Sequence, residues 1–133
     1  MHEHPLVGGI EAGGTKIVCA AGTGPGDLSR AVFPSGSDPA AALFAVTDWF
    51  REEETRRGPL HAIGIGSFGP VDLDPASPTY GFITSTPKTG WRNTDILGTV
   101  RRAFPALPVA FDTDVNAAAM GEQRWGAAAG LDD

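Results

Sequence analysis

Short apolar runs separated by glycine-rich turns open the chain. Ile, Val, Leu and Ala are frequent in runs at residues 6–10, 16–21 and 28–33, and glycine or proline flanks each run. Apolar runs of this length between turn residues predict β-strands. Because the connections are short, we expect these strands to form an antiparallel meander.

The apolar residues then change to helical spacing. Between positions 39 and 57 they recur three or four residues apart, which predicts a helix whose apolar face packs on the sheet. Ser37 or Asp38 can cap the start of this helix, and Pro39 suits its first position. Gly58 ends the helix, and the charged segment 51–57 is expected to be exposed. The predicted core positions of the helix are Leu43, Val46, Trp49 and Phe50.

Strands and helices alternate in the remainder of the chain. Apolar runs predict strands at 61–66 and 109–111, and helical periodicity predicts helices at 94–104 and 115–128. Strands that alternate with helices imply parallel neighbours. We therefore predict an α/β fold around a mixed five-stranded sheet, in which the three-strand meander is followed by alternating helices and strands.

Composition and charge narrow the class of protein. With 133 residues, 41% hydrophobic and 20% charged, the chain has the size and composition of one globular domain. The net charge of −6 argues against nucleic acid as a general partner. The single cysteine, Cys19, excludes an internal disulfide, and its mid-strand position indicates a buried hydrophobe. We find neither a signal peptide nor an apolar segment that could span a membrane, so we expect a cytoplasmic protein.

The turn between the first two predicted strands is the first candidate for chemistry, in the sequence GIEAGGTK at 9–16. Gly13 and Gly14 let backbone N–H groups approach a phosphate closely. Thr15 adds a hydroxyl and Lys16 a positive charge, while Glu11 can orient a Mg²⁺ ion or its waters. The spacing is not that of a P-loop. A plain hairpin turn with two glycines at positive φ explains the same residues.

A second candidate begins with the strand at 109–111, in the sequence FDTDVNAAAMGE at 111–122. Ligands of open α/β sheets bind outside the carboxyl ends of the strands. A carboxylate there, Asp112 or Asp114, can take a proton from a substrate hydroxyl. Either aspartate can instead be a simple helix N-cap.

The segment 67–91 is long and rich in Pro and Gly, and we expect a short hairpin near 80–83. Irregular stretches of this length within a domain are usually functional. Its parts SFGPVD at 67–72 and STPKTGW at 85–91 offer hydroxyl and backbone groups that could surround a polyol. Ordinary turn chemistry, with Trp91 as a core residue, is the alternative.

Taken together and in this order, the motifs resemble those of the ROK family of sugar kinases, within the hexokinase–actin-like ATPase superfamily. GIEAGGTK resembles the family's first phosphate motif, with Glu11 where many members carry Asp. GSFGPV at 66–71 resembles its sugar-side loop, and DVNAAAMGE at 114–122 is similar to the segment that holds the catalytic Asp. The resemblance covers residues 6–132 and implies an actin-like ATPase, or ribonuclease H-like, lobe.

Within the family the chain resembles the bacterial fructokinases. The combination of GIEAGGTK, IGSFGPVD at 65–72 and TPKTGW at 86–91 is typical of them. ROK glucokinases usually carry Asn at the positions of Lys88 and Thr113, which argues against glucose as the main substrate.

The resemblance implies phosphoryl transfer from ATP to the 6-hydroxyl of fructose, with Asp114 as the catalytic residue. The implied ATP-phosphate and Mg²⁺ residues are Glu11, Gly13, Gly14, Thr15 and Lys16. The implied sugar-binding residues are Gly69, Pro70, Lys88, Thr113 and Asp114.

The family is built of two lobes, and residues 1–133 are expected to be the N-terminal one. A second lobe would carry another phosphate motif, the adenosine pocket and a zinc-binding cluster, so Zn²⁺ is expected only in the parent family and no metal site within this chain. The expected small-molecule partners are a hexose and ATP with Mg²⁺, and a homodimer is a further expectation. We expect the chain to be inactive alone.

Three alternatives accompany the fructokinase interpretation. One is a kinase for another hexose such as mannose or glucose. Another is a ROK-type sugar-binding regulator; these carry a helix-turn-helix before the first strand, whereas the first predicted strand here starts at residue 6. The last is a non-enzymatic module that keeps the fold. The intact Asp114 and the Gly13-Gly14 turn favour an enzyme over these last two.

Overall fold

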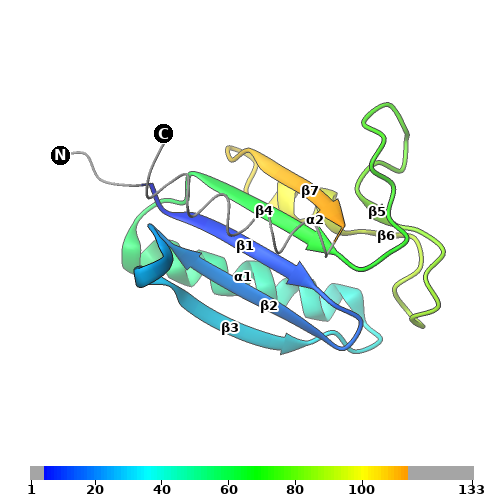
Figure 1. Cartoon of the computed structure of the whole chain (residues 1–133), viewed down its shortest axis with the longest axis horizontal. Helices are drawn as coiled ribbons and strands as arrows, with labels where there is room; N and C mark the ends of the chain where they lie inside the picture. The colour runs from blue at the N-terminus through cyan, green and yellow to red at the C-terminus, as the bar shows by residue number, and fades with distance from the viewer. Residues whose placement is uncertain (1–4, 114–133) are drawn as a thin grey trace.

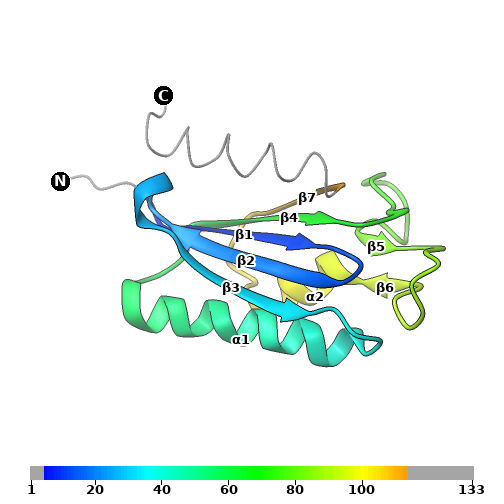
Figure 2. The same ribbon diagram turned by 60° about the horizontal axis from the view of Figure 1, so that its bottom comes forward.

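A mixed five-stranded sheet forms one layer of the molecule, and two helices cover one of its faces (Figures 1 and 2). The computed structural model describes residues 5–113. The strand order β3-β2-β1-β4-β7 confirms the mixed sheet predicted from the sequence. The strands of this sheet are β1 Val7–Ala12, β2 Lys16–Gly22, β3 Ser29–Pro34, β4 Ala62–Ser67 and β7 Val109–Thr113.

The direction of the strands follows the predicted pattern. β1 and β2 pair antiparallel, as do β2 and β3, and a short 3₁₀ helix, η1 Pro25–Asp27, lies in the β2–β3 connection. β4 runs parallel to β1, and β7 runs parallel to β4. β1 extends beyond the predicted 6–10 because Glu11 and Ala12 still pair with β4. The carboxyl ends of β1, β4 and β7 therefore reach one edge of the sheet (Figure 1).

Helix α1 spans Pro39–Arg57, within the predicted limits. The side chain of Asp38 accepts a hydrogen bond from Ala41 N at 3.3 Å, so Asp38 rather than Ser37 is the N-cap. Gly58 ends the helix with φ 98°. Leu43, Val46 and Phe50 are buried against the sheet, and Trp49 is partly buried beside them, as the spacing predicted.

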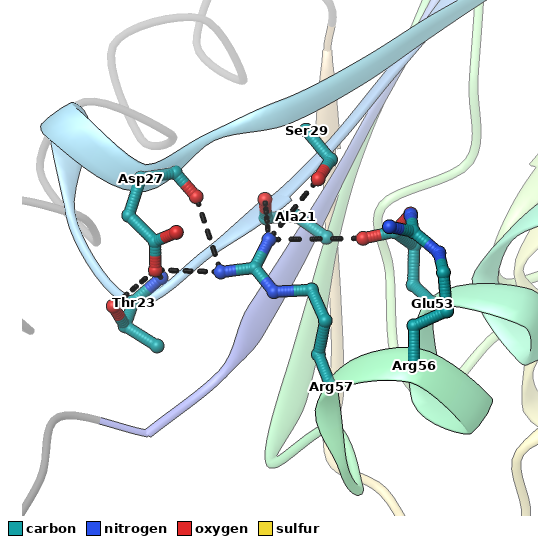
Figure 3. Close-up of polar contacts among 7 residues, drawn as sticks. All are labelled: Ala21, Thr23, Asp27, Ser29, Glu53, Arg56 and Arg57. Atoms are coloured by element: carbon teal, nitrogen blue, oxygen red, sulfur yellow. Dashed lines mark hydrogen bonds and ion pairs between the residues drawn. The ribbon is translucent and has the colours of Figure 1, made fainter.

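The charged end of α1 is only partly exposed, whereas the whole of 51–57 was expected to be exposed. Glu53 is only 1% exposed, and Arg57 is mostly buried because its side chain crosses to the β2–β3 connection (Figure 3). The Arg57 guanidinium donates to Ala21 O at 3.2 Å, Ser29 Oγ at 3.1 Å and Asp27 O at 3.2 Å, and pairs with Asp27 Oδ2 at 2.6 Å. These contacts hold the end of α1 against the meander.

The segment between β4 and β7 differs from the prediction in two places. The short strand β5 Phe82–Ile83 pairs antiparallel with β6 Thr94–Asp95 across a ten-residue loop. On the N-terminal side, Ile83 also forms an antiparallel bridge to Val71, so the hairpin expected near 80–83 is present but reaches back to residue 71. Helix α2 is Ile96–Ala103, so it begins later than the predicted residue 94, because Thr94 and Asp95 are taken up by this pairing. Asp95 caps the helix by accepting from Gly98 N at 2.8 Å.

The core lies between the sheet and the two helices. Ile10, Ile17, Ile63 and Ile65 from the strands and Leu43, Phe50, Leu97 and Val100 from the helices are buried there. Cys19 is fully buried in the same core, as predicted, and burial raises the pKa of its thiol to about 12. Within residues 5–113, neither helix has the length and apolar character needed to cross a membrane. The helix predicted at 115–128 lies outside the described residues.

Candidate functional site

The β1–β2 turn, residues 13–15, lies at the carboxyl end of β1. Gly13 N donates to Lys16 O at 2.9 Å and closes the turn. A Cβ on Gly13 would lie 3.0 Å from Lys16 O, whereas a Cβ on Gly14 would have no atom within 4 Å. Neither glycine has a positive φ, so the backbone conformation expected at both positions of a plain hairpin turn is wrong, although the turn does join the antiparallel strands β1 and β2. Gly14 instead faces open space, and Thr15 and Lys16 are exposed beside it.

Ser35 supports this turn from the residue after β3, and no pattern in the sequence singles it out. Its side chain is 1% exposed. Ser35 Oγ donates to Gly13 O at 2.7 Å, and Ser35 N donates to Thr15 O at 3.0 Å. One buried serine therefore holds both sides of the turn.

Two carboxylates lie in one row across the parallel strands. Glu11 of β1 is in register with Gly66 of β4, which is in register with Asp112 of β7. In-register neighbours share a face of the sheet, and two strand spacings separate the outer backbones by about 10 Å. Glu11 is exposed and Asp112 partly buried, and the glycine between them adds no side chain. Within residues 5–113, no group of three or more His, Cys, Asp or Glu side chains is placed to hold a metal ion.

The 67–71 loop continues from β4 beside the end of β1. Phe68 N donates to Ala12 O at 2.8 Å, which keeps the loop close to the β1–β2 turn. The Gly69–Pro70 peptide bond is cis, and both residues are exposed. Pro70 O accepts from Thr84 N at 2.9 Å and from Thr84 Oγ1 at 3.2 Å. This loop is thereby joined to the start of the 84–93 loop.

The 84–93 loop is anchored by Trp91. The indole is fully buried and its Nε1 donates to Gly36 O at 2.9 Å. Its ring meets that of Phe68 edge to face, with centroids 5.7 Å apart. Lys88 is partly buried, and its backbone N donates to Thr86 Oγ1 at 3.2 Å. Trp91 is thus a core residue, as the turn-chemistry alternative held, and it also connects this loop to the segment after β3.

The fold brings the separate sequence motifs to one edge. Ala12 at the end of β1 is in register with Ser67 of β4, and Ser67 is in register with Thr113 of β7. The turn at 13–15, the loop at 67–71 and the end of β7 therefore start side by side. The backbone of Thr113 lies at this edge, and Asp114 is outside the described residues.

Comparisons with known proteins agree with this arrangement. Residues 7–133 match the ROK family. A protein of Bacillus subtilis (strain 168), whose name assigns it provisionally to the fructokinases, is 51% identical over 128 residues, covering 96% of this chain and 40% of that protein. The fructokinase of Pediococcus pentosaceus is 46% identical over 123 residues, covering 92% of this chain and 41% of that protein. The chain thus spans about 40% of the length of these relatives.

Among solved structures, a ROK family glucokinase from Streptomyces griseus, in complex with glucose and AMPPNP, is similar in fold. The TM-score is 0.68 at 27% sequence identity, covering 91% of this chain and 37% of that one. This likeness confirms the actin-like ATPase class of fold expected from the sequence. Because the family match covers nearly the whole chain and the fold agrees with it, the chain belongs to the ROK family.

Proposed function

We propose that residues 1–133 are the N-terminal lobe of an ATP-dependent fructokinase, which transfers a phosphoryl group from ATP to the 6-hydroxyl of fructose. The observation that carries this proposal is the register of Ala12, Ser67 and Thr113, which starts the three motif-bearing segments at one edge of the sheet. Reactants of phosphoryl transfer must be aligned closely, so converging loops suit the reaction. Relatives named fructokinase support the choice of sugar.

The β1–β2 turn would bind the phosphates of ATP. The open space at Gly14 gives an oxygen room to approach the backbone, while the exposed Thr15 and Lys16 add a hydroxyl and a positive charge. Glu11 supplies a hard oxygen ligand of the kind that Mg²⁺ or its waters take, and Asp112 lies in the same row. A bound Mg²⁺ would neutralise charge on the phosphates. Gly13 lets the turn close tightly enough to bind phosphate, because a side chain there would press on Lys16 O.

The sugar would lie against the 67–71 and 84–93 loops, with Gly69, Pro70, Lys88 and Thr113 around it. Asp114 would orient the 6-hydroxyl and accept its proton. A positioned base contributes about 10²–10⁴-fold to the rate. The family match extends over Asp114, which supports this assignment.

The test uses the full-length product of the gene, with ADP release followed in a coupled assay for fructose, mannose and glucose. Asp114→Asn is expected to lower kcat by about 10²–10⁴-fold, because the amide cannot accept the proton. Fructose binding, measured by calorimetry, should change little. Asp48→Asn, at an exposed position of α1, is the matched control and should keep full activity.

The outcomes separate the parts of the proposal. Turnover near that of the unmodified protein in Asp114→Asn would remove Asp114 from its role. A higher kcat/KM for glucose or mannose than for fructose would overturn the choice of sugar. A protein that releases no ADP with any of the three hexoses would overturn the kinase function.

A further inference from the structure

Ser35 fixes the orientation of the β1–β2 turn. Its hydroxyl and its backbone N–H hold the carbonyl oxygens of Gly13 and Thr15 at 2.7 and 3.0 Å. In a trans peptide the carbonyl and the following N–H point in opposite directions. Holding Gly13 O toward Ser35 therefore directs the N–H of Gly14 away from it. With this orientation, the N–H of Gly14 would be available to donate to a phosphate oxygen at the turn.

The segment that carries Ser35 is in turn held by the 84–93 loop. Gly36, the next residue, accepts the indole N–H of Trp91 at 2.9 Å. Gly90 packs so closely that a Cβ there would lie 2.1 Å from Ser37 O. Residues 35–37 are thus fixed between the β1–β2 turn on one side and the 84–93 loop on the other.

We propose that Ser35 is a positioning residue for ATP, and that Trp91 acts on the same turn through Gly36. This inference rests on the proposed kinase function of the site. Ser35 is too buried to meet a ligand itself, so it acts only through the backbone of the turn. A residue of the sugar-side loop then influences how the phosphates are held.

Variants of the full-length product of the gene separate positioning from general stability. Ser35→Ala removes the hydroxyl, and Ser35→Thr keeps it. Thr47→Val is the matched control, because Thr47 also buries a hydroxyl that donates to a backbone carbonyl, Leu43 O at 3.1 Å, but within α1. Trp91→Phe removes the indole N–H and keeps an aromatic ring. For each variant we would measure the thermal midpoint, kcat and the KM values of ATP and fructose.

Ser35→Ala is expected to raise the KM of ATP by about three- to tenfold, the worth of one buried hydrogen bond. In Ser35→Ala the KM of fructose should stay within about twofold of the unmodified protein's value. Ser35→Thr keeps the hydroxyl, so its KM of ATP should equal that of the unmodified protein. Thr47→Val should lower the thermal midpoint without changing the KM of ATP. Trp91→Phe should also raise the KM of ATP, although Trp91 belongs to the sugar-side loop.

An unchanged KM of ATP in Ser35→Ala, with an active unmodified protein, would overturn the role of Ser35. A change confined to the KM of fructose in Trp91→Phe would overturn the connection through Gly36. Equilibrium titration with a non-hydrolysable ATP analogue repeats the comparison without turnover. If the unmodified protein binds the analogue but phosphorylates no hexose, the proposed function fails while the role of Ser35 is still decided by this titration. If it binds no analogue, the inference fails as well.

Discussion

At Gly90 the 84–93 loop packs directly against the backbone of Ser37. Its φ of 91° is in the left-handed region, and a Cβ would meet Ser37 O at 2.1 Å. A side chain at this position therefore meets both conformational strain and a backbone clash. Ser37 lies two residues after Ser35, which holds the β1–β2 turn. A substitution that displaces Ser37 should therefore also disturb this turn.

Gly90→Ala is expected to lower the free energy of unfolding by at least about 1–2 kcal/mol, the cost of a left-handed alanine alone. Denaturant unfolding measures this change. Gly26→Ala is the control, because Gly26 has no atom near a Cβ and no positive φ. Equal stability of the two variants would mean that the 84–93 loop is not packed on Ser37 in solution.

At the scale of elements, one side chain joins α1 to the meander. Arg57 donates to Ala21, Asp27 and Ser29, and its nearest Glu53 oxygen lies 3.7 Å away. Arg56 also contacts the buried Glu53. A hydrogen bond from the Thr23 side chain, with further contributions from Arg57, lowers the pKa of Asp27. The pair of Arg57 and Asp27 therefore stays charged to a more acidic pH than a free aspartate would allow.

Arg57→Met is expected to destabilise the chain by about 1–3 kcal/mol. It removes hydrogen bonds from a charged donor, and it takes away one of the positive charges that face the buried carboxylate of Glu53. Arg30→Met, at an exposed position of β3, should change stability by less than about 0.5 kcal/mol. Urea unfolding of both variants gives the comparison. If Arg57→Met proves as stable as Arg30→Met, the contact shown in Figure 3 does not hold α1 in place.

At the scale of the whole molecule, the chain spans about 40% of the length of its named relatives. If it is one lobe of a kinase, it supplies one wall of the site, and the reactants are neither enclosed nor shielded from water. Closure of a site around both reactants is the source of much of the rate acceleration by positioning.

We therefore expect the isolated 133-residue chain to release no ADP from Mg-ATP and fructose. The same assay on a protein in which the chain continues into a second lobe should show turnover. Circular dichroism of the short chain is the control that it folds. Turnover by the short, folded chain would contradict the two-lobe proposal and would point to a site completed by another copy.

Local signals explain why some elements were predictable. The limits of α1 follow from Asp38, Pro39 and Gly58, which act within a turn of the helix ends. The meander follows from apolar runs between glycine turns, and its strands lie within two residues of the predicted limits. The pairing of Phe82 with Asp95 could not be predicted from local sequence signals, because the 84–93 loop separates the two residues. Ser35 shows no distinguishing pattern, since its role depends on contacts with Gly13 and Thr15, 22 and 20 residues earlier in the chain.

By itself the sequence determined the features that depend on neighbouring residues. These are the ends of α1, the apolar positions that face the core, and the motifs that indicate the family. Caps, periodicity and turn chemistry act over a few residues, so they can be read along the chain. Only the tertiary structure decided that the three motif-bearing segments start side by side, that Ser35 and Trp91 support one turn, and that Glu53 is buried and Arg57 mostly so. Those facts depend on strand register and on packing between distant segments, which no local pattern encodes.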